Sequence, residues 1–134
     1  MKVLFSLLFL SLAFSCSNKL APDAGWGRQR WILVEMKGVP VQQSGGRRDA
    51  SLNFDVYQRR FSGNGGCNQM NGGYHIDGRS ITFSDVITTK MNCEDIEFEN
   101  TFLRLLDRVS RFEQNGDNLL LKDKKETVLV FRSR

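Results

Sequence analysis

The chain has 134 residues and a formal net charge of +4 at pH 7. This length suits one domain with a single modest core. The basic residues are scattered along the chain and alternate with acidic ones. A nucleic-acid-binding protein instead concentrates its basic residues on one stripe beside aromatic side chains. We therefore expect no nucleic-acid partner.

The N-terminus predicts an exported protein. Lys2 precedes a run of 12 almost wholly apolar residues, Val3–Phe14. This run is too short to cross a bilayer as a helix, which takes about 20 residues. A basic start followed by a short apolar run is typical of a secretory signal peptide. We therefore expect residues 1–15 to be a signal peptide, residues 16–28 a polar tether, and residues 29–134 the folded domain.

The signal peptide ends at a cysteine. The sequence LAFSC, which ends at Cys16, resembles the lipobox of bacterial lipoproteins, in which the cysteine is lipidated and becomes the first mature residue. An unpaired cysteine is a hazard in an oxidising compartment, and lipidation removes it. We expect Cys16 to carry the lipid (palmitate) and to hold the protein in the bacterial envelope, at the outer membrane facing the periplasm. The alternative is an ordinary signal peptide with Cys16 unmodified.

Two further cysteines, Cys67 and Cys93, remain for the folded domain. In an exported domain the simplest arrangement is one disulfide between them, which closes a loop of 27 residues. Such a loop corresponds to ~3–4 kcal/mol in the chain-entropy model. The alternative is a metal site that includes His75, but zinc needs three or four ligands at tetrahedral positions. One histidine and two distant cysteines do not supply them, so we expect no metal.

Apolar periodicity predicts several short strands before residue 90. Trp31–Met36 is apolar and β-branched, and residues 51–56 alternate between apolar and polar, which is typical of a half-buried strand. A hairpin turn is expected at Asp77-Gly78. Further strands are expected over residues 57–61, 74–76, 81–83 and 86–89.

A glycine-rich stretch, residues 63–73, interrupts these strands. Its composition predicts turns with positive φ rather than regular structure. A phosphate-binding loop would need Gly-Lys-Ser/Thr at the start of a helix, which is not present. We expect Gly66 and Asn68 to shape a turn that presents Cys67, with the Asn68 side chain bonded to local backbone.

One helix is predicted over residues 94–109. Asn92 is expected as its N-cap, with Asp95 completing an approximate capping box. Acidic residues at positions 94, 95, 97 and 99 suit the positive end of the helix dipole, and we prefer this role to a hydrolase site with paired carboxylates. The apolar residues with helical spacing are Phe98, Phe102, Leu105, Leu106 and Val109.

Three strands follow the predicted helix, over residues 110–114, 118–122 and 127–131, with a type I′ turn at Asn115-Gly116. The expected fold is therefore α+β and mainly antiparallel. We expect a small coiled sheet or a partly open barrel of about seven to nine short strands, with one helix over an opening or edge.

The residues also resemble the META domain family, also called HslJ-like. The segments GCNQMNGGY (residues 66–74) and TTKMNC (residues 88–93) carry the more specific part of the match. The resemblance implies a compact antiparallel β fold with a helix, and envelope lipoproteins linked in a general way to stress tolerance. It offers no catalytic residues to transfer. Its motifs contain both domain cysteines and the structural residues Gly66, Asn68, Tyr74 and Asn92.

We expect a membrane-tethered, non-enzymatic domain without a cofactor, which binds a protein or a small apolar ligand and supports envelope integrity under stress. A deep apolar cavity would favour this function. The alternative is an assembly factor or chaperone for another exported protein that acts by strand addition, which would need a long unpaired edge. A hydrolase, or an inhibitor of an envelope enzyme, is less favoured. We expect His75 on the surface, because Tyr74 and Ile76 face the core.

Overall fold

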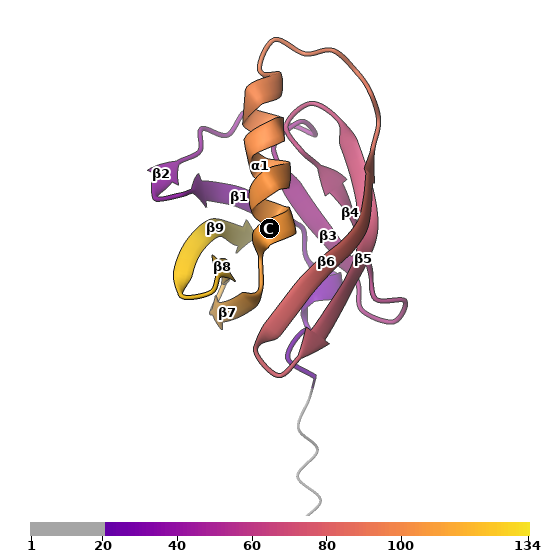
Figure 1. The fold of residues 1–134 in the computed structure, drawn as a ribbon, viewed down its shortest axis with the longest axis vertical. Coiled ribbons are helices and arrows are strands. Elements are labelled where there is room, and N and C mark those ends of the chain that lie inside the picture. The colour runs from indigo at the N-terminus through magenta and orange to yellow at the C-terminus, as the bar shows by residue number, and fades with distance from the viewer. Residues whose placement is uncertain (1–20) are drawn as a thin grey trace, which may run out of the picture.

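Nine antiparallel strands form one sheet in the computed structural model, which describes residues 21–134 (Figure 1). The predicted signal peptide, Cys16 and the first part of the predicted tether lie outside the described residues. There are two helical segments, the 3₁₀ helix η1 (Trp26–Arg28) and the α-helix α1 (Ile96–Arg108). The strands are β1 (Trp31–Met36), β2 (Val39–Pro40), β3 (Ser51–Asp55), β4 (Arg60–Asn64), β5 (Gln69–Asp77), β6 (Ser80–Thr88), β7 (Arg111–Asn115), β8 (Asn118–Asp123) and β9 (Glu126–Ser133).

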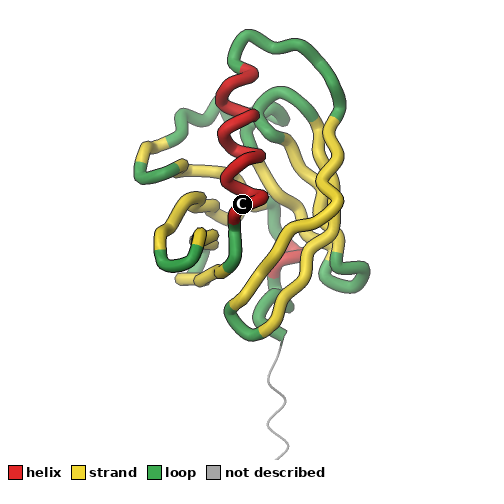
Figure 2. Tube along the Cα trace, in the orientation of Figure 1, coloured by secondary structure: helices red, strands yellow, loops and turns green. Residues whose placement is uncertain are grey.

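The sheet curls into a barrel because its first and last long strands pair with each other. Strand β1 pairs with β9 along most of its length and with β3 on its other side. The barrel is nearly open between β6 and β7, where only Ser80 and Arg111 are paired. Helix α1 connects these two strands and lies along the gap (Figures 1 and 2). This architecture confirms the predicted α+β class and the partly open barrel.

The inside of the barrel is filled by the alternate residues of its strands. In β3, Leu52 and Phe54 are buried whereas Asn53 and Asp55 are exposed, as the period of two predicted. Helix α1 adds an apolar face to the same core. The largest fully buried side chains are Trp26, Trp31, Phe102, Phe131, Ile32, Leu33, Leu52, Met70, Ile81, Leu106, Leu119 and Leu121.

The described part of the expected tether, residues 21–28, is folded onto the barrel. The indole of Trp26 is fully buried, with its ring centroid 4.8 Å from that of Phe54 and 5.2 Å from that of Phe112. Its Nε1 donates a 2.8 Å hydrogen bond to Oε1 of Gln114. The tether prediction is therefore wrong for these residues, because Trp26 closes one end of the barrel.

Helix α1 begins later than expected, and its predicted N-cap is wrong. The N-cap is Asp95, whose side chain makes no capping hydrogen bond. Asn92 is exposed and lies outside the helix. The reason is tertiary, because Cys93 is tied to Cys67 by a disulfide, and Asn68 binds the backbone N–H of Met91 at 2.6 Å. These contacts hold the chain out of helical geometry up to the start of α1.

The glycine-rich stretch is more regular than its composition predicted. Most of it belongs to β4 and β5, and only residues 65–68 lie between these strands. Position 63 of β4 requires glycine, because a Cβ there would overlap the carbonyl oxygen of Ser51 on the neighbouring strand. Glycine at this position serves close strand pairing rather than a turn.

The hairpin predicted at Asn115-Gly116 forms, but with a different turn. Asn115 pairs with Asn118, so the turn residues are Gly116 and Asp117. Of these two only Gly116 has positive φ, at 58°. A type I′ turn needs positive φ at both central residues, whereas type II′ has glycine at the first. The geometry therefore matches type II′ and not the predicted type I′.

No helix among residues 21–134 is long and apolar enough to cross a membrane.

The burial of Trp26 predicts a large effect of its removal. We expect Trp26→Ala to lower the free energy of unfolding by ~3–5 kcal/mol, since it removes a buried indole and leaves a cavity. Guanidinium denaturation followed by circular dichroism measures this change. The control is Tyr57→Ala, because Tyr57 is 97% exposed, and it should change stability by no more than about 0.5 kcal/mol. Equal stability of the two variants would contradict the assignment of Trp26 to the core.

Candidate functional site: an apolar groove beside helix α1

A groove of about 450 Å³ opens between the β1–β2 hairpin, the loop of residues 41–50 and the start of α1. Three ionisable residues, Arg48, Asp49 and Asp95, line it together with the polar residues Gln42, Gln43 and Ser44. The apolar lining consists of Leu33, Met36, Val39, Pro40, Val41, Ala50 and Phe98. The combination of apolar side chains with a set of polar ones makes the groove a candidate binding site.

The hairpin of β1 and β2 forms one wall and carries an exposed apolar side chain. Its turn residues, Lys37 and Gly38, both have positive φ, at 50° and 77°. Positive φ at both positions fits the type I′ turn that matches the strand twist. The turn is followed by Val39, which pairs with Met36 and is 65% exposed. Apolar surface is thus presented to water at the groove, where burial by a ligand would be favourable.

The loop wall is held by a buried carboxylate. Asp49 accepts hydrogen bonds from the backbone N–H groups of Ser44 and Gly45 and from Oγ of Ser44, each at 2.8 Å. The backbone bond from Ser44 is the main cause that lowers the pKa of Asp49, and the charge of Arg30 acts in the same direction. The ionised form of Asp49 therefore fixes the shape of this wall.

On the helix side, Gly66 and Phe98 meet at the groove. Gly66 has φ +108°, and a Cβ at this residue would lie 2.9 Å from Cδ1 of Phe98. Its N–H donates a 2.7 Å hydrogen bond to Oδ1 of Asn64. Only glycine satisfies both the positive φ and the close approach to the ring. Gly66 thus shapes the predicted turn, and it also places Phe98 in the groove lining.

Behind this turn lies a buried carboxylate, Glu99, which is 3% exposed. Its Oε2 accepts hydrogen bonds from the N–H groups of Cys67 at 3.0 Å and Asn68 at 2.6 Å, and its Oε1 accepts one from Nδ2 of Asn68 at 2.7 Å. Hydrogen bonds to an ionised acceptor are roughly twice as strong as those between neutral groups. Glu99 therefore joins α1 to the Cys67-Asn68 turn.

Asn68 connects the same turn to the segment that precedes α1. Its Oδ1 accepts hydrogen bonds from Oγ1 of Thr89 at 2.8 Å and from the N–H of Met91 at 2.6 Å. The disulfide between Cys67 and Cys93, with a Cα–Cα distance of 6.0 Å, joins the same two segments, as expected. Apart from Sγ of the neighbouring Cys67, the partners of the Asn68 side chain are 21 to 31 residues away, so the expectation of local backbone partners is wrong.

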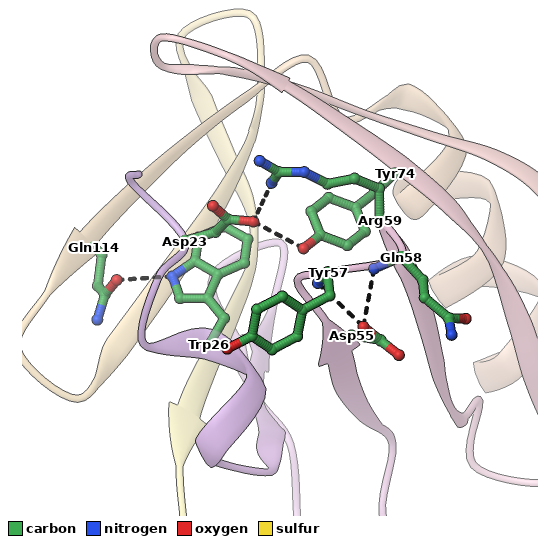
Figure 3. A network of polar contacts seen from close by, with 8 residues as sticks. All are labelled: Asp23, Trp26, Asp55, Tyr57, Gln58, Arg59, Tyr74 and Gln114. Carbon is green, nitrogen blue, oxygen red and sulfur yellow. Dashed lines mark hydrogen bonds and ion pairs between the residues drawn. The ribbon is translucent and has the colours of Figure 1, made fainter. Parts of the chain in front are cut away.

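The remaining predicted residues lie away from the groove. The Tyr74 ring is buried in the core, and its hydroxyl donates a 2.8 Å hydrogen bond to Oδ2 of Asp23, which also forms an ion pair with Arg59 (Figure 3). Burial, and then the neighbouring Asp23, raise the pKa of Tyr74. His75 is exposed, as predicted. Among residues 21–134 no group of three or more His, Cys, Asp or Glu side chains is arranged to hold a metal ion.

Three carboxylates with structural roles were not identified from the sequence. Glu99 was assigned to the helix start, although it lies three residues before Phe102 and seven before Leu106, on the apolar face of the helix. That position is a usable signal of burial. Asp23 and Asp49 are flanked by polar or small residues without periodicity, so no sequence pattern marked them.

The contacts of Glu99 predict a specific loss of stability on neutralisation. In Glu99→Gln the side-chain amide would face the donor groups of Asn68, leaving at least one buried N–H without an acceptor. We expect the free energy of unfolding to fall by ~1–3 kcal/mol, measured by guanidinium denaturation. The exposed Glu97 on the same helix turn is the matched control. Glu97→Gln should change stability by about 0.5 kcal/mol or less, and an equal loss in both variants would contradict the role of Glu99.

The lowered pKa of Asp49 predicts an acid transition at the groove. Ionised Asp49 stabilises the loop fully above its ordinary pKa of 3.8, and this stabilisation is lost as pH falls through the lower folded-state value. NMR should show the amide resonances of Ser44 and Gly45 shifting through this acid range, while that of the distant Leu119 stays constant. Asp49→Asn should abolish the transition, and its persistence in the variant would assign it to another group.

The fold recurs in solved structures with low sequence identity. A protein from Burkholderia xenovorans, solved by NMR, matches with a TM-score of 0.67 and 20% identity over 88% of this chain and 94% of that one. A second NMR structure gives 0.67 and 19% over 84% and 95%. A crystal structure of a DUF4847 family protein from Bacteroides vulgatus gives 0.62 and 18% over 82% and 95%. These similarities concern the fold alone.

The sequence itself matches a family model. No curated protein matches the chain. The model of the META domain matches residues 24–134, which include η1 and every strand of the barrel. Because this match spans most of the chain, the protein belongs to the META domain family.

Proposed function

We propose that this protein is a membrane-tethered, non-enzymatic domain of the bacterial envelope that binds a protein or a small apolar ligand in the groove beside α1, and so supports envelope integrity under stress. The observation that carries the proposal is the groove itself. Its volume of about 450 Å³ lies within the ~300–1,000 Å³ typical of ligand sites, which are mainly apolar with a few polar groups.

The walls of the groove support binding because they are fixed before a ligand arrives. The disulfide and the Glu99 contacts hold the start of α1, and the Asp49 contacts hold the opposite loop. A preorganised site loses little conformational entropy on binding. The exposed Val39 would then supply much of the apolar area that a ligand buries.

Tethering is proposed from the LAFSC sequence that ends at Cys16. The described chain starts at the end of the barrel away from β2 and the start of α1 (Figure 1). A lipid on Cys16 would therefore leave the groove facing away from the anchored end, accessible to periplasmic molecules. The localisation at the outer membrane, facing the periplasm, belongs to the same proposal.

The alternative of an assembly factor that acts by strand addition has less support. Strand β2 ends the sheet order and has only two residues, Val39 and Pro40. Proline has no backbone N–H to donate, and short strands with proline are devices that block edge pairing. This edge is a poor template for a partner strand, so we favour side-chain contacts in the groove.

The experiment compares Val39→Asp with Ile87→Asp, because Ile87 is 63% exposed and lies outside the groove. The probe is the neutral fluorophore N-phenyl-1-naphthylamine, titrated into the full chain. Burial of a valine side chain is worth ~1.5–3 kcal/mol, so the Kd should rise about tenfold in Val39→Asp and stay unchanged in Ile87→Asp. No binding by the unaltered protein, or equal weakening by both variants, would contradict the proposal.

The same variants identify the natural ligand. The unaltered protein and Val39→Asp are captured from whole envelopes, and the co-purifying proteins and lipids are compared by mass spectrometry. The ligand is expected among the molecules lost in Val39→Asp and retained in Ile87→Asp. If no molecule shows this pattern, the groove is not the binding site.

A further inference from the structure

The turn between β3 and β4 presents a tyrosine entirely to solvent. Tyr57 is 97% exposed, more than any other large apolar side chain of the described residues. The turn is ordered by Asp55, whose Oδ1 accepts hydrogen bonds from the N–H groups of Tyr57 at 3.1 Å and Gln58 at 3.0 Å (Figure 3). The backbone of the turn is therefore held in place, and it carries the exposed ring at the surface of the barrel.

The start of the described chain lies against this same turn. The buried Asp23 forms an ion pair with Arg59, the last residue of the turn. A shallow hollow of about 320 Å³ is lined on one side by Ala24 and Arg28, and on the other by Asp55 and Tyr57. The turn that carries Tyr57 thus lies beside the point where the chain enters the barrel.

The length of the preceding sequence limits how far this end can stand from an anchor. Cys16 and Ala21 are five residues apart. A fully extended chain spans at most ~3.6 Å per residue, so Ala21 lies within about 18 Å of a lipidated Cys16. This distance is less than the diameter of a small domain, ~30 Å. An anchored domain must therefore keep its η1 end near the headgroups.

The side chains at this end suit an anionic lipid surface. Tyrosine is enriched where one part of its ring meets apolar material and its hydroxyl meets water, as at membrane interfaces. Arg28 is exposed and lines the hollow beside Tyr57. Arg60, three residues after Tyr57, is also exposed, and its guanidinium lies 3.5 Å from Oδ1 of Asn71. Basic residues near an anionic leaflet are attracted to its phosphates.

We propose that the η1 end of the barrel is a membrane-contact face, on which Tyr57 enters the headgroup region and Arg28 and Arg60 bind anionic phospholipid phosphates. The occupant of this face is the phospholipid leaflet that carries the lipid anchor. The inference rests on the proposed tethering at Cys16. It adds an orientation, because contact at this end points the groove beside α1 away from the membrane.

The test places a fluorescent reporter at each end of the molecule. Tyr57→Trp and, as a matched control, Val39→Trp are made in the full chain, purified from membranes and reconstituted into vesicles of phosphatidylethanolamine and phosphatidylglycerol with brominated acyl chains. Trp26 and Trp31 are buried in the barrel and give a constant background. We expect the added fluorescence of Tyr57→Trp to be quenched by about half or more, because bromine quenches only at short range, and that of Val39→Trp to be unchanged.

The outcomes separate this inference from the tethering proposal. The intact mass of the same sample reports whether Cys16 carries a lipid. Quenching at position 57 in a protein without a lipid on Cys16 would support the contact face and contradict the proposed lipid anchor. The absence of quenching at position 57, or equal quenching at both positions, would overturn the contact face whatever the state of Cys16.

The role of charge is tested in the Tyr57→Trp background. Arg28→Gln combined with Arg60→Gln removes two cationic groups, so quenching should fall at least about twofold in anionic vesicles. The control is Arg104→Gln, an exposed arginine on α1, which should have no effect. The Tyr57→Trp protein with both arginines intact is also measured in vesicles of phosphatidylcholine alone. If it is quenched there as strongly as in anionic vesicles, anionic lipid is not required and that part of the proposal is overturned.

Discussion

The fold depends on one buried carboxylate. The barrel leaves a gap between β6 and β7, and only a helix held firmly against that gap can complete the core. Glu99 holds the helix in this position, since three N–H donors from the Cys67-Asn68 turn bind its two carboxylate oxygens. A buried charge is tolerated only when such partners replace water. The position of α1, and with it one side of the groove, follows from this contact.

The two ends of the barrel have different physical characters. At one end Trp26 fills the interior with an aromatic cluster, and the polar contacts of Asp23 close the surface around it. At the other end the β1–β2 hairpin stands away from α1 and leaves apolar side chains in contact with water. The second end is itself held by the disulfide and the Glu99 contacts. The two ends therefore differ in how much apolar surface they expose.

Features with local periodicity were predictable, and those that depend on distant partners were not. The apolar face of α1 and the alternation in β3 were visible because each repeats at the period of its element. The position of Asn92 suggested a cap, but the disulfide and Asn68 determine where the helix begins. Trp26 lies in a polar segment with glycine and proline, which carries no period. The groove depends on β2, whose two residues are too few to produce a pattern.

The way in which the chain enters the barrel also determines how the molecule bears load. Any tension on the chain ahead of Ala21 reaches the ion pair between Asp23 and Arg59 first, and the indole of Trp26 next. Trp26 belongs to the hydrophobic core, and Asp23 is buried beside it. A pull on the chain ahead of Ala21 would therefore act directly on the barrel, and the first contacts to break would already be contacts of the folded domain.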